Sequence, residues 1–271
     1  MSKKKTQAPK TKKQSPKAHS TRVQKPEKGK SSPIEKKQVV CLCGDEQIVK
    51  EYSAVFQEHG VTVLELKNIS SLASSAKKIT LAFELSLGSG DTKKRNLTAL
   101  DTHLPPAVPV VLSSLAETVL MQTHNLDTKD RFVGIAAFPT LIGNHLVELC
   151  PSLYTKSEIL ESVKKFFESI KKETAVVQDG VGMVMPRILC QIINEAFFVV
   201  NHDIAQPKDI DIAMKFGTNY PRGPIEWGEH IGFKNIVTVL DALYQNNAEE
   251  RYRVAPLLRQ LAVAGTFWGN K

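Results

Sequence analysis

Residues 217–227 read Gly-Thr-Asn-Tyr-Pro-Arg-Gly-Pro-Ile-Glu-Trp, and this block organises the last third of the chain. Its two glycines and two prolines interrupt any helix that enters it, because proline lacks an amide donor and glycine adopts turn conformations easily. The block therefore predicts a turn between two helices, with the aromatic ring of Trp227 packed against them.

Apolar residues on either side of this block recur with a helical period. The run from Ile188 to Val200 predicts one buried helix. Pro207 opens a second helix, because proline suits a first helical turn, and Gly217 is a residue that can end it. Residues 235–244 and 255–264 form two more helices. Since strand patterns stop at about residue 179, we predict an all-helical domain over residues 179–271.

Upstream, over residues 38–178, short apolar runs alternate with helical patterns. Thr155 and Glu158 have the spacing of a capping box in front of one such helix. Uninterrupted apolar runs are typical of strands covered on both faces, and the alternation predicts an α/β domain with an open parallel sheet. Its ligand crevice should lie beyond the carboxyl ends of the strands. The runs are 39–42, 61–66, 79–83, 108–112, 132–136 and 174–177, and the other helical stretches are 45–59, 93–104 and 116–126.

The basic character of the chain belongs to its first 37 residues. The 271 residues carry a net charge of +8, but residues 1–37 hold 13 Lys+Arg and two acids, so the remainder is net −3. This tail has no aromatic and few large apolar residues, so we predict that it is disordered. A globular nucleic-acid binder with a basic face is disfavoured. The tail either attracts a polyanion, such as nucleic acid or anionic lipid, or serves only as a solubilising extension.

The cysteines and apolar runs exclude further classes of protein. Cys41, Cys43, Cys150 and Cys190 are too few for a disulfide scaffold and lack the spacing of a zinc site, so we expect reduced thiols in a cytoplasmic protein and no metal. No apolar run is long enough to span a membrane. The charged N-terminus lacks the apolar core of a signal peptide.

Several segments of the helical region carry a family resemblance. Asn194-Glu-Ala196, Asp209-Ile-Asp-Ile-Ala-Met214 and the 217–227 block resemble the C-terminal domain of the 3-hydroxyacyl-CoA dehydrogenases, with the bacterial 3-hydroxybutyryl-CoA dehydrogenases as the nearest group. The similarity extends weakly over residues 38–178. It implies a Rossmann-like domain that binds NAD, a helical dimerisation domain that helps to enclose an acyl-CoA, and oxidation of the 3-hydroxyl group to a ketone by hydride transfer.

The resemblance places the family's cofactor turn, Gly-x-Gly-x-x-Gly, at residues 44–49. Gly44 is retained, whereas the other two glycines are Glu46 and Val49. Asp45 and Glu46 put carboxylates where phosphates would sit, although acids there also suit a helix N-terminus. The acid that holds the ribose in the family is Lys67, a residue type that would favour NADP over NAD.

Two further cofactor-binding positions are matched on the third predicted strand and the helix after it. Glu84 and Lys93 correspond to family residues near the cofactor, while a second family glutamate is Gly88. The family's Ser-Asn pair after the fourth strand falls near residues 112–113. Gly44, Glu84 and Lys93 are therefore the candidate cofactor-binding residues.

The catalytic dyad of the family is half lost. The resemblance places its glutamate at Glu148 and its proton-accepting histidine at Ala136. A methyl group cannot accept a proton, and the asparagine that assists the histidine is Pro186. His145, three residues before Glu148, is the one pattern-adjacent histidine that could act as a relocated base.

The sequence supports two classes of function. In the first, the chain is a catalytically impaired family member, a binding or structural protein that retains acyl-CoA affinity, forms a homodimer or pairs with an active paralogue. In the second, it is an active NAD-dependent oxidoreductase that converts 3-hydroxyacyl-CoA to 3-ketoacyl-CoA at a rebuilt site. The combined losses at the glycine turn, Ala136 and Pro186 favour the first.

Overall fold

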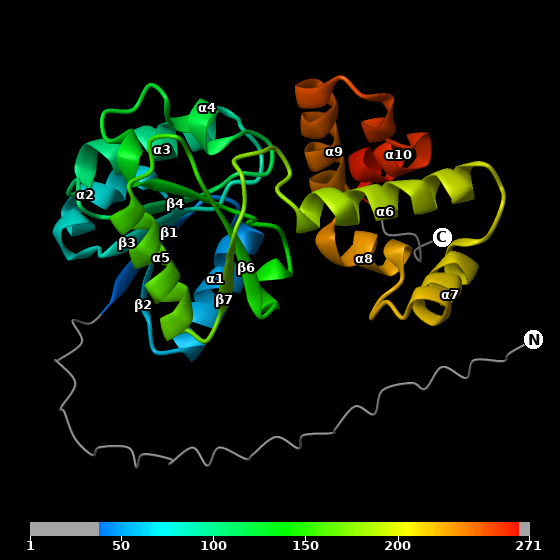
Figure 1. Cartoon of the computed structure of the whole chain (residues 1–271), viewed down its shortest axis with the longest axis horizontal. Helices are drawn as coiled ribbons and strands as arrows, with labels where there is room; N and C mark the ends of the chain where they lie inside the picture. The colour runs from blue at the N-terminus through cyan, green and yellow to red at the C-terminus, as the bar shows by residue number, and fades with distance from the viewer. Residues whose placement is uncertain (1–37, 266–271) are drawn as a thin grey trace, which may run out of the picture. The chain divides into compact units, whose positions relative to one another are not determined.

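The structure, a computed structural model, describes residues 38–265. The basic tail, with its expected disorder, lies outside the described residues. Seven strands form one sheet in the order β2-β1-β3-β4-β5-β6-β7, with helices on its faces (Figure 1). The strands are β1 Val39–Cys43, β2 Thr62–Glu65, β3 Leu81–Glu84, β4 Val110–Ser113, β5 Phe132–Ile135, β6 Leu146–Pro151 and β7 Glu173–Val176.

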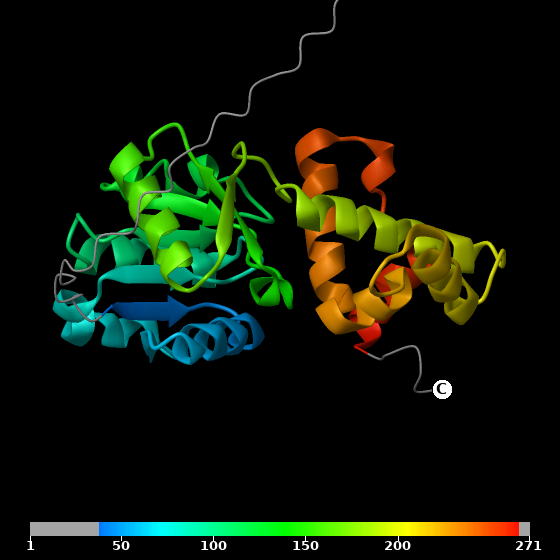
Figure 2. The ribbon, with the colours of Figure 1, turned by 60° about the horizontal axis from the view of Figure 1, so that its bottom comes forward.

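Five helices accompany the sheet and five more follow it without further strands. Figure 2 shows the strands side by side and the later helices, coloured yellow to red, as a purely helical group. The first five are α1 Glu46–Glu58, α2 Leu72–Ser75, α3 Asp91–His103, α4 Val119–Thr123 and α5 Ser157–Ser169; the others are α6 Met185–Asn201, α7 Pro207–Thr218, α8 Pro224–Ile231, α9 Phe233–Asn247 and α10 Pro256–Ala264. Within residues 38–265, no helix has the length and apolarity to cross a membrane.

The predicted parallel sheet is confirmed for β1 to β5, whereas β6 and β7 run antiparallel to those strands. β6 pairs antiparallel with β5, through Gly134 opposite Cys150, and β7 then pairs parallel with β6. The sequence pattern missed β6 because its centre is the charged Glu148 and its end is Pro151, which leaves no continuous apolar run. The other six strands were predicted within a few residues of their ends, and β1, β3, β4 and β5 have almost entirely buried residues.

Two predicted helix boundaries differ from the structure. Thr155 does not cap α5: its hydroxyl donates to the Phe132 carbonyl at 2.7 Å and accepts from the Ser152 amide at 2.8 Å, so it fastens the β6–α5 turn to β5 instead. Gly217 does not end α7, which continues to Thr218 and closes at Asn219 in the left-handed conformation. Asparagine tolerates that conformation better than most residues, so glycine is not required there.

Aromatic packing joins α1 and α5 over β3. The rings of Phe56 and Phe166 meet edge to face at 5.1 Å between centroids, and Phe83 lies 5.2 Å from Phe56 and 5.8 Å from Phe166. Tyr52 and Phe167 extend the same cluster. Because such rings bury large apolar areas, this cluster fixes α1 and α5 against the sheet.

The 217–227 block contains the predicted turn, which lies between the end of α7 at Thr218 and the start of a short helix, α8, at Pro224. Asp211 of α7 accepts hydrogen bonds from the Ile225 and Glu226 amides at 2.8 and 3.1 Å, so it satisfies the exposed N-terminus of α8. A side chain at Gly223 would lie 2.1 Å from the Asp211 carboxyl carbon. The glycine is therefore required because the two segments approach closely. Trp227 is half-buried against the core, as the sequence predicted.

Candidate functional site

The order of the sheet reverses at β1, which lies between β2 and β3. In open α/β sheets, ligands bind beyond the carboxyl ends of the strands at such a point. The structure places Gly44 directly after β1, Glu84 at the end of β3 and Lys93 in the first turn of α3. The three residues predicted to bind cofactor therefore gather at the expected edge.

Gly44 approaches the segment after β3 closely. It has φ +125°, and a side-chain carbon there would lie 2.5 Å from the backbone of Leu85 and Ser86. One residue later, the Asp45 carboxylate accepts a hydrogen bond from the Leu87 amide at 2.8 Å. The retained glycine thus lets the β1–α1 and β3–α3 loops meet, and Asp45 ties them together.

Pockets on the two sides of Asp45 have different walls. Gly44, Glu46 and Lys67 line one of about 530 Å³, whereas Asp45 and Leu87 line another of about 310 Å³ that reaches Lys234 of α9. Glu46 also forms an ion pair with Lys50, 2.6 Å between Oε1 and Nζ, which lowers the pKa of the Glu46 carboxyl.

Glu84 and Lys93 lie together, but inside the protein. Their side chains are 0% and 3% exposed, with Nζ of Lys93 3.7 Å from Oε2 of Glu84. The Lys93 ammonium donates to the Ser86 and Ser113 carbonyls at 2.8 and 2.6 Å. Glu84 accepts from the Ser86 hydroxyl and from Asn96. Burial raises the pKa of Glu84 and lowers the pKa of Lys93. The contacts of both side chains join β3, α3 and β4.

These contacts do not fit a bound NAD. A pyrophosphate needs backbone amides at a glycine-rich helix N-terminus and no competing negative charge. Here the first turn of α1 carries Glu46, Asp45 bonds to the opposite loop, and the Lys93 ammonium donates to backbone carbonyls. In the turn after β1, Glu46 and Val49 thus replace the two glycines, and Asp45 adds a second carboxylate.

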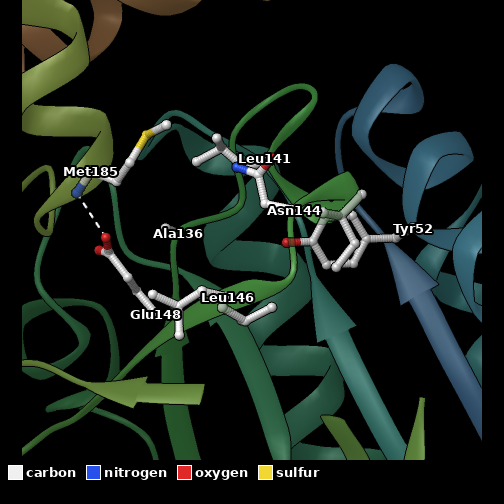
Figure 3. Close-up of a pocket in the computed structure, with 9 residues that line it drawn as sticks. Tyr52, Ala136, Leu141, Asn144, Leu146, Glu148 and Met185 are labelled. Atoms are coloured by element: carbon white, nitrogen blue, oxygen red, sulfur yellow. Dashed lines mark hydrogen bonds between the residues drawn. The ribbon is translucent and has the colours of Figure 1, made fainter. Parts of the chain in front are cut away.

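Ala136 and Glu148 line one pocket of about 180 Å³ (Figure 3). Ala136 follows β5 and Glu148 is central in β6, the antiparallel neighbour of β5. The remaining walls come from α1, from the segment between β5 and β6 and from the start of α6. The two positions that carry the family dyad are therefore brought together, with a methyl group on one side and a carboxylate on the other.

The Glu148 carboxylate is engaged by helix α6. It accepts hydrogen bonds from the Val184 amide at 2.9 Å and the Met185 amide at 2.7 Å, the second of which is drawn in Figure 3. A carboxylate at a helix N-terminus satisfies exposed amides and complements the helix dipole. Pro186 occupies the first turn of α6, where proline needs no amide partner. The retained glutamate thus has a structural task that requires no histidine.

Tyr52 is a pocket residue that sequence reasoning missed. It belongs to α1, and Figure 3 shows its hydroxyl directed into the pocket beside Asn144. Its ring lies in the aromatic cluster, so the helical period marked it only as a core residue. Nothing in the sequence distinguishes its hydroxyl from that of any other buried tyrosine.

His145 does not lie beside Glu148. Its imidazole is exposed and faces Glu173, with 3.2 Å between Nε2 and Oε1. The pocket around Ala136 is lined by no histidine among the described residues. His124 and His230 instead contact backbone carbonyls of their own helices. Geometry therefore gives no support to His145 as a relocated base.

Among the described residues, the cysteines and possible metal ligands form no further candidate site. The four thiols are buried and unbridged, and burial raises the pKa of Cys41 to about 12. In the part of the chain that the structure describes, no three His, Cys, Asp or Glu side chains gather as a metal site would need.

Comparison with known proteins identifies the family of both regions. Residues 44–180 match the family model described as 3-hydroxyacyl-CoA dehydrogenase, NAD binding domain, and residues 182–270 match the model of the C-terminal domain of the same enzymes. A 3-hydroxybutyryl-CoA dehydrogenase of Bradyrhizobium diazoefficiens is 28% identical over 185 residues, which are 68% of this chain and 63% of that protein. A probable 3-hydroxybutyryl-CoA dehydrogenase of Bacillus subtilis is 29% identical over 206 residues, 75% of this chain and 71% of that one.

Solved structures agree on the fold. M. tuberculosis FadB2 superposes with a TM-score of 0.75 at 18% identity, covering 84% of this chain and 94% of that one. The (S)-3-hydroxybutyryl-CoA dehydrogenase PaaH1 of Ralstonia eutropha gives 0.66 at 22% identity, with 84% and 94% covered. Since the two family models together span most of the sequence, this chain belongs to the 3-hydroxyacyl-CoA dehydrogenase family.

Proposed function

We propose that this chain is a catalytically impaired member of its family, which acts as a binding or structural protein in acyl-CoA metabolism. The observation that carries the proposal is the pocket at Ala136. Hydride transfer from a 3-hydroxyl group requires a base for the hydroxyl proton, and the pocket presents a methyl group at that place. Glu148, the one carboxylate among the described residues that line the pocket, accepts two hydrogen bonds from backbone amides at the start of α6.

The cofactor side supports the same proposal independently. NAD is the cofactor that the family match suggests, and the carboxylates of Asp45 and Glu46 stand where its pyrophosphate would lie. Lys67, two residues after β2, is a residue type that suits a 2′-phosphate, but a single lysine does not replace a pyrophosphate cradle. We therefore propose that NAD and NADP bind weakly or not at all.

An assay of hydride transfer tests the proposal. The purified full chain is mixed with NADH and a short 3-ketoacyl-CoA, and with NAD and the corresponding 3-hydroxyacyl-CoA, while absorbance of the nicotinamide is followed. We expect no rate above the protein-free background. Robust turnover would favour the alternative, an active NAD-dependent oxidoreductase with a rebuilt site. His145→Ala would then distinguish a relocated base, since only in that case should the variant lose its turnover.

We further propose that the chain pairs through its helical domain, with a second copy or with an active paralogue. Ile212 and Phe216 lie one turn apart on α7, and Phe216 is 86% exposed. Val263 of α10 and Ile188 of α6 are also exposed. Ile212 and Phe216 are neighbours on one face of α7, and adjacent exposed apolar side chains of this kind suit a protein–protein contact. The pairing, the acyl-CoA affinity and a polyanion partner for the tail are all proposals, as is a cytoplasmic location.

Substitution of Phe216 by serine should weaken self-association. If Phe216 is a central residue of the interface, its removal should cost about 2 kcal/mol of binding free energy, which is a shift of about 30-fold in dissociation constant. Sedimentation velocity at micromolar concentration measures the change. Leu153→Ser, at an 89% exposed position in the sheet domain, is the matched control and should leave the association unchanged. A wild type that is monomeric by itself and with any paralogue would contradict the pairing.

A further inference from the structure

The pocket at Ala136 has the size and walls of a site for a small organic group. Its volume is about 180 Å³, and Leu141, Ile142, Leu146 and Val147 make most of the lining apolar. For comparison, an apolar cavity of about 150 Å³ in another protein stays dry and binds benzene. The lining leaves room for roughly one six-membered ring.

The charges of the lining limit which groups can enter. Among the described residues, Glu148 is the one charged side chain that lines the pocket, and no lysine or arginine does. Its carboxylate is stabilised by the Val184 and Met185 amides. Burying an anion without a cation beside it is costly, and a second negative charge next to Glu148 adds repulsion. Phosphate and carboxylate groups are therefore disfavoured.

The Tyr52 hydroxyl provides an independent sign of a ligand. Tyr52 is 1% exposed, and no hydrogen bond joins its hydroxyl to another pocket residue drawn in Figure 3. Figure 3 shows the hydroxyl directed into the pocket. The hydroxyl is not among the fully buried polar atoms that lack a partner, so it stays accessible from the pocket, and an acceptor placed beside it would gain a hydrogen bond. Burial raises the pKa of Tyr52, which keeps the group protonated and able to donate.

We propose that the pocket binds a small uncharged group, of about the size of a six-membered ring, which accepts a hydrogen bond from the Tyr52 hydroxyl through a carbonyl oxygen or a ring nitrogen. The proposal rests on the proposed function, because an imidazole at position 136 would project into the same space. A site that has lost its proton acceptor thus becomes a binding pocket, with Tyr52 as its polar contact.

Pyridine and benzene provide a matched pair of probes, since they share one shape and differ in the acceptor nitrogen. Binding is followed by chemical shifts of the Met185 methyl group, which lines the pocket, at a pH where pyridine is uncharged. We expect wild type to bind pyridine about 3- to 10-fold more tightly than benzene, the net value of one hydrogen bond. Acetate should not bind.

Two variants complete the experiment. Tyr52→Phe keeps the ring packing and should bind both probes equally. Ala136→Leu fills the pocket and should bind neither. Equal affinity of wild type for both probes, or a preference for pyridine that survives Tyr52→Phe, would overturn the proposal, as would failure of both probes to bind. The proposed function fails separately, through NADH-dependent turnover, whichever probes bind.

Discussion

Ala136→His alone should leave the protein without measurable hydride transfer between NAD(H) and a short 3-hydroxyacyl-CoA. A positioned general base contributes about 10²- to 10⁴-fold to such a rate. The new imidazole would, however, meet a Glu148 carboxylate that already accepts two α6 amides. It would also lack a cofactor, because Glu46 and Val49 remain in the glycine turn.

Residues that act as a unit are not additive, so activity should depend on restoring the set. The quadruple variant Glu46→Gly, Val49→Gly, Ala136→His and Pro186→Asn should turn over at least about 10²-fold faster than the triple variant that retains Ala136, the lower value for one general base, whereas Ala136→His alone should stay at background. Steady-state rates of these variants measure this. The triple variant that retains Ala136 is the matched control and should stay at background. Full activity of Ala136→His by itself would contradict the loss of the cofactor site.

Lys93→Met should destabilise the fold by about 3–5 kcal/mol, because it leaves the Glu84 carboxylate buried without its cation. Urea unfolding followed by circular dichroism measures the change. Lys94→Met, at the exposed neighbouring position of α3, is the control and should change stability by less than about 0.5 kcal/mol. A loss below 1 kcal/mol in Lys93→Met would mean that the pair does not hold β3, α3 and β4 together.

The double variant Glu84→Gln with Lys93→Met should recover part of that loss and flatten the pH dependence of stability. Glu84 has a raised pKa when folded, so its favourable contribution is present below its ordinary value of 4.5 and is lost as pH rises through the folded pKa. Lys93 has a lowered pKa, so its favourable contribution is present above 10.5 and is lost as pH falls. Both charges therefore oppose folding near neutral pH, and unfolding titrations between these limits should show the double variant changing least.

Much of the fold was predictable because burial leaves a simple pattern in parallel strands. The uninterrupted apolar runs located six of the seven strands, and helical periodicity located α1, α3, α5, α6 and α9. β6 escaped because it combines a buried acid with a terminal proline. α8 escaped because its glycine and proline residues are typical of turns, and only the contact between Asp211 and the α8 amides explains why a helix begins at Pro224.

The candidate site was predictable in position but not in its contacts. The resemblance placed Ala136 and Glu148 together, and the structure shows them lining one pocket. It could not show that Glu148 caps α6, that Lys93 donates to carbonyls of Ser86 and Ser113, or that Tyr52 directs its hydroxyl into the pocket. Each depends on contacts between segments distant in sequence. The roles of Gly44, Glu84, Lys93 and Glu148 in binding or catalysis stay predictions.

A titration of the purified full chain with NADH tests the loss of the cofactor site most directly. Nicotinamide fluorescence is followed up to millimolar concentrations, in parallel with the quadruple variant that regains the glycines, His and Asn. Asp45 and Glu46 place carboxylates at the cofactor turn, and the Lys93 ammonium donates to a backbone carbonyl. We therefore expect no saturable NADH signal in the wild type and a saturable signal in the variant. Saturable binding of NADH by the wild type at micromolar concentration would contradict the impaired assignment.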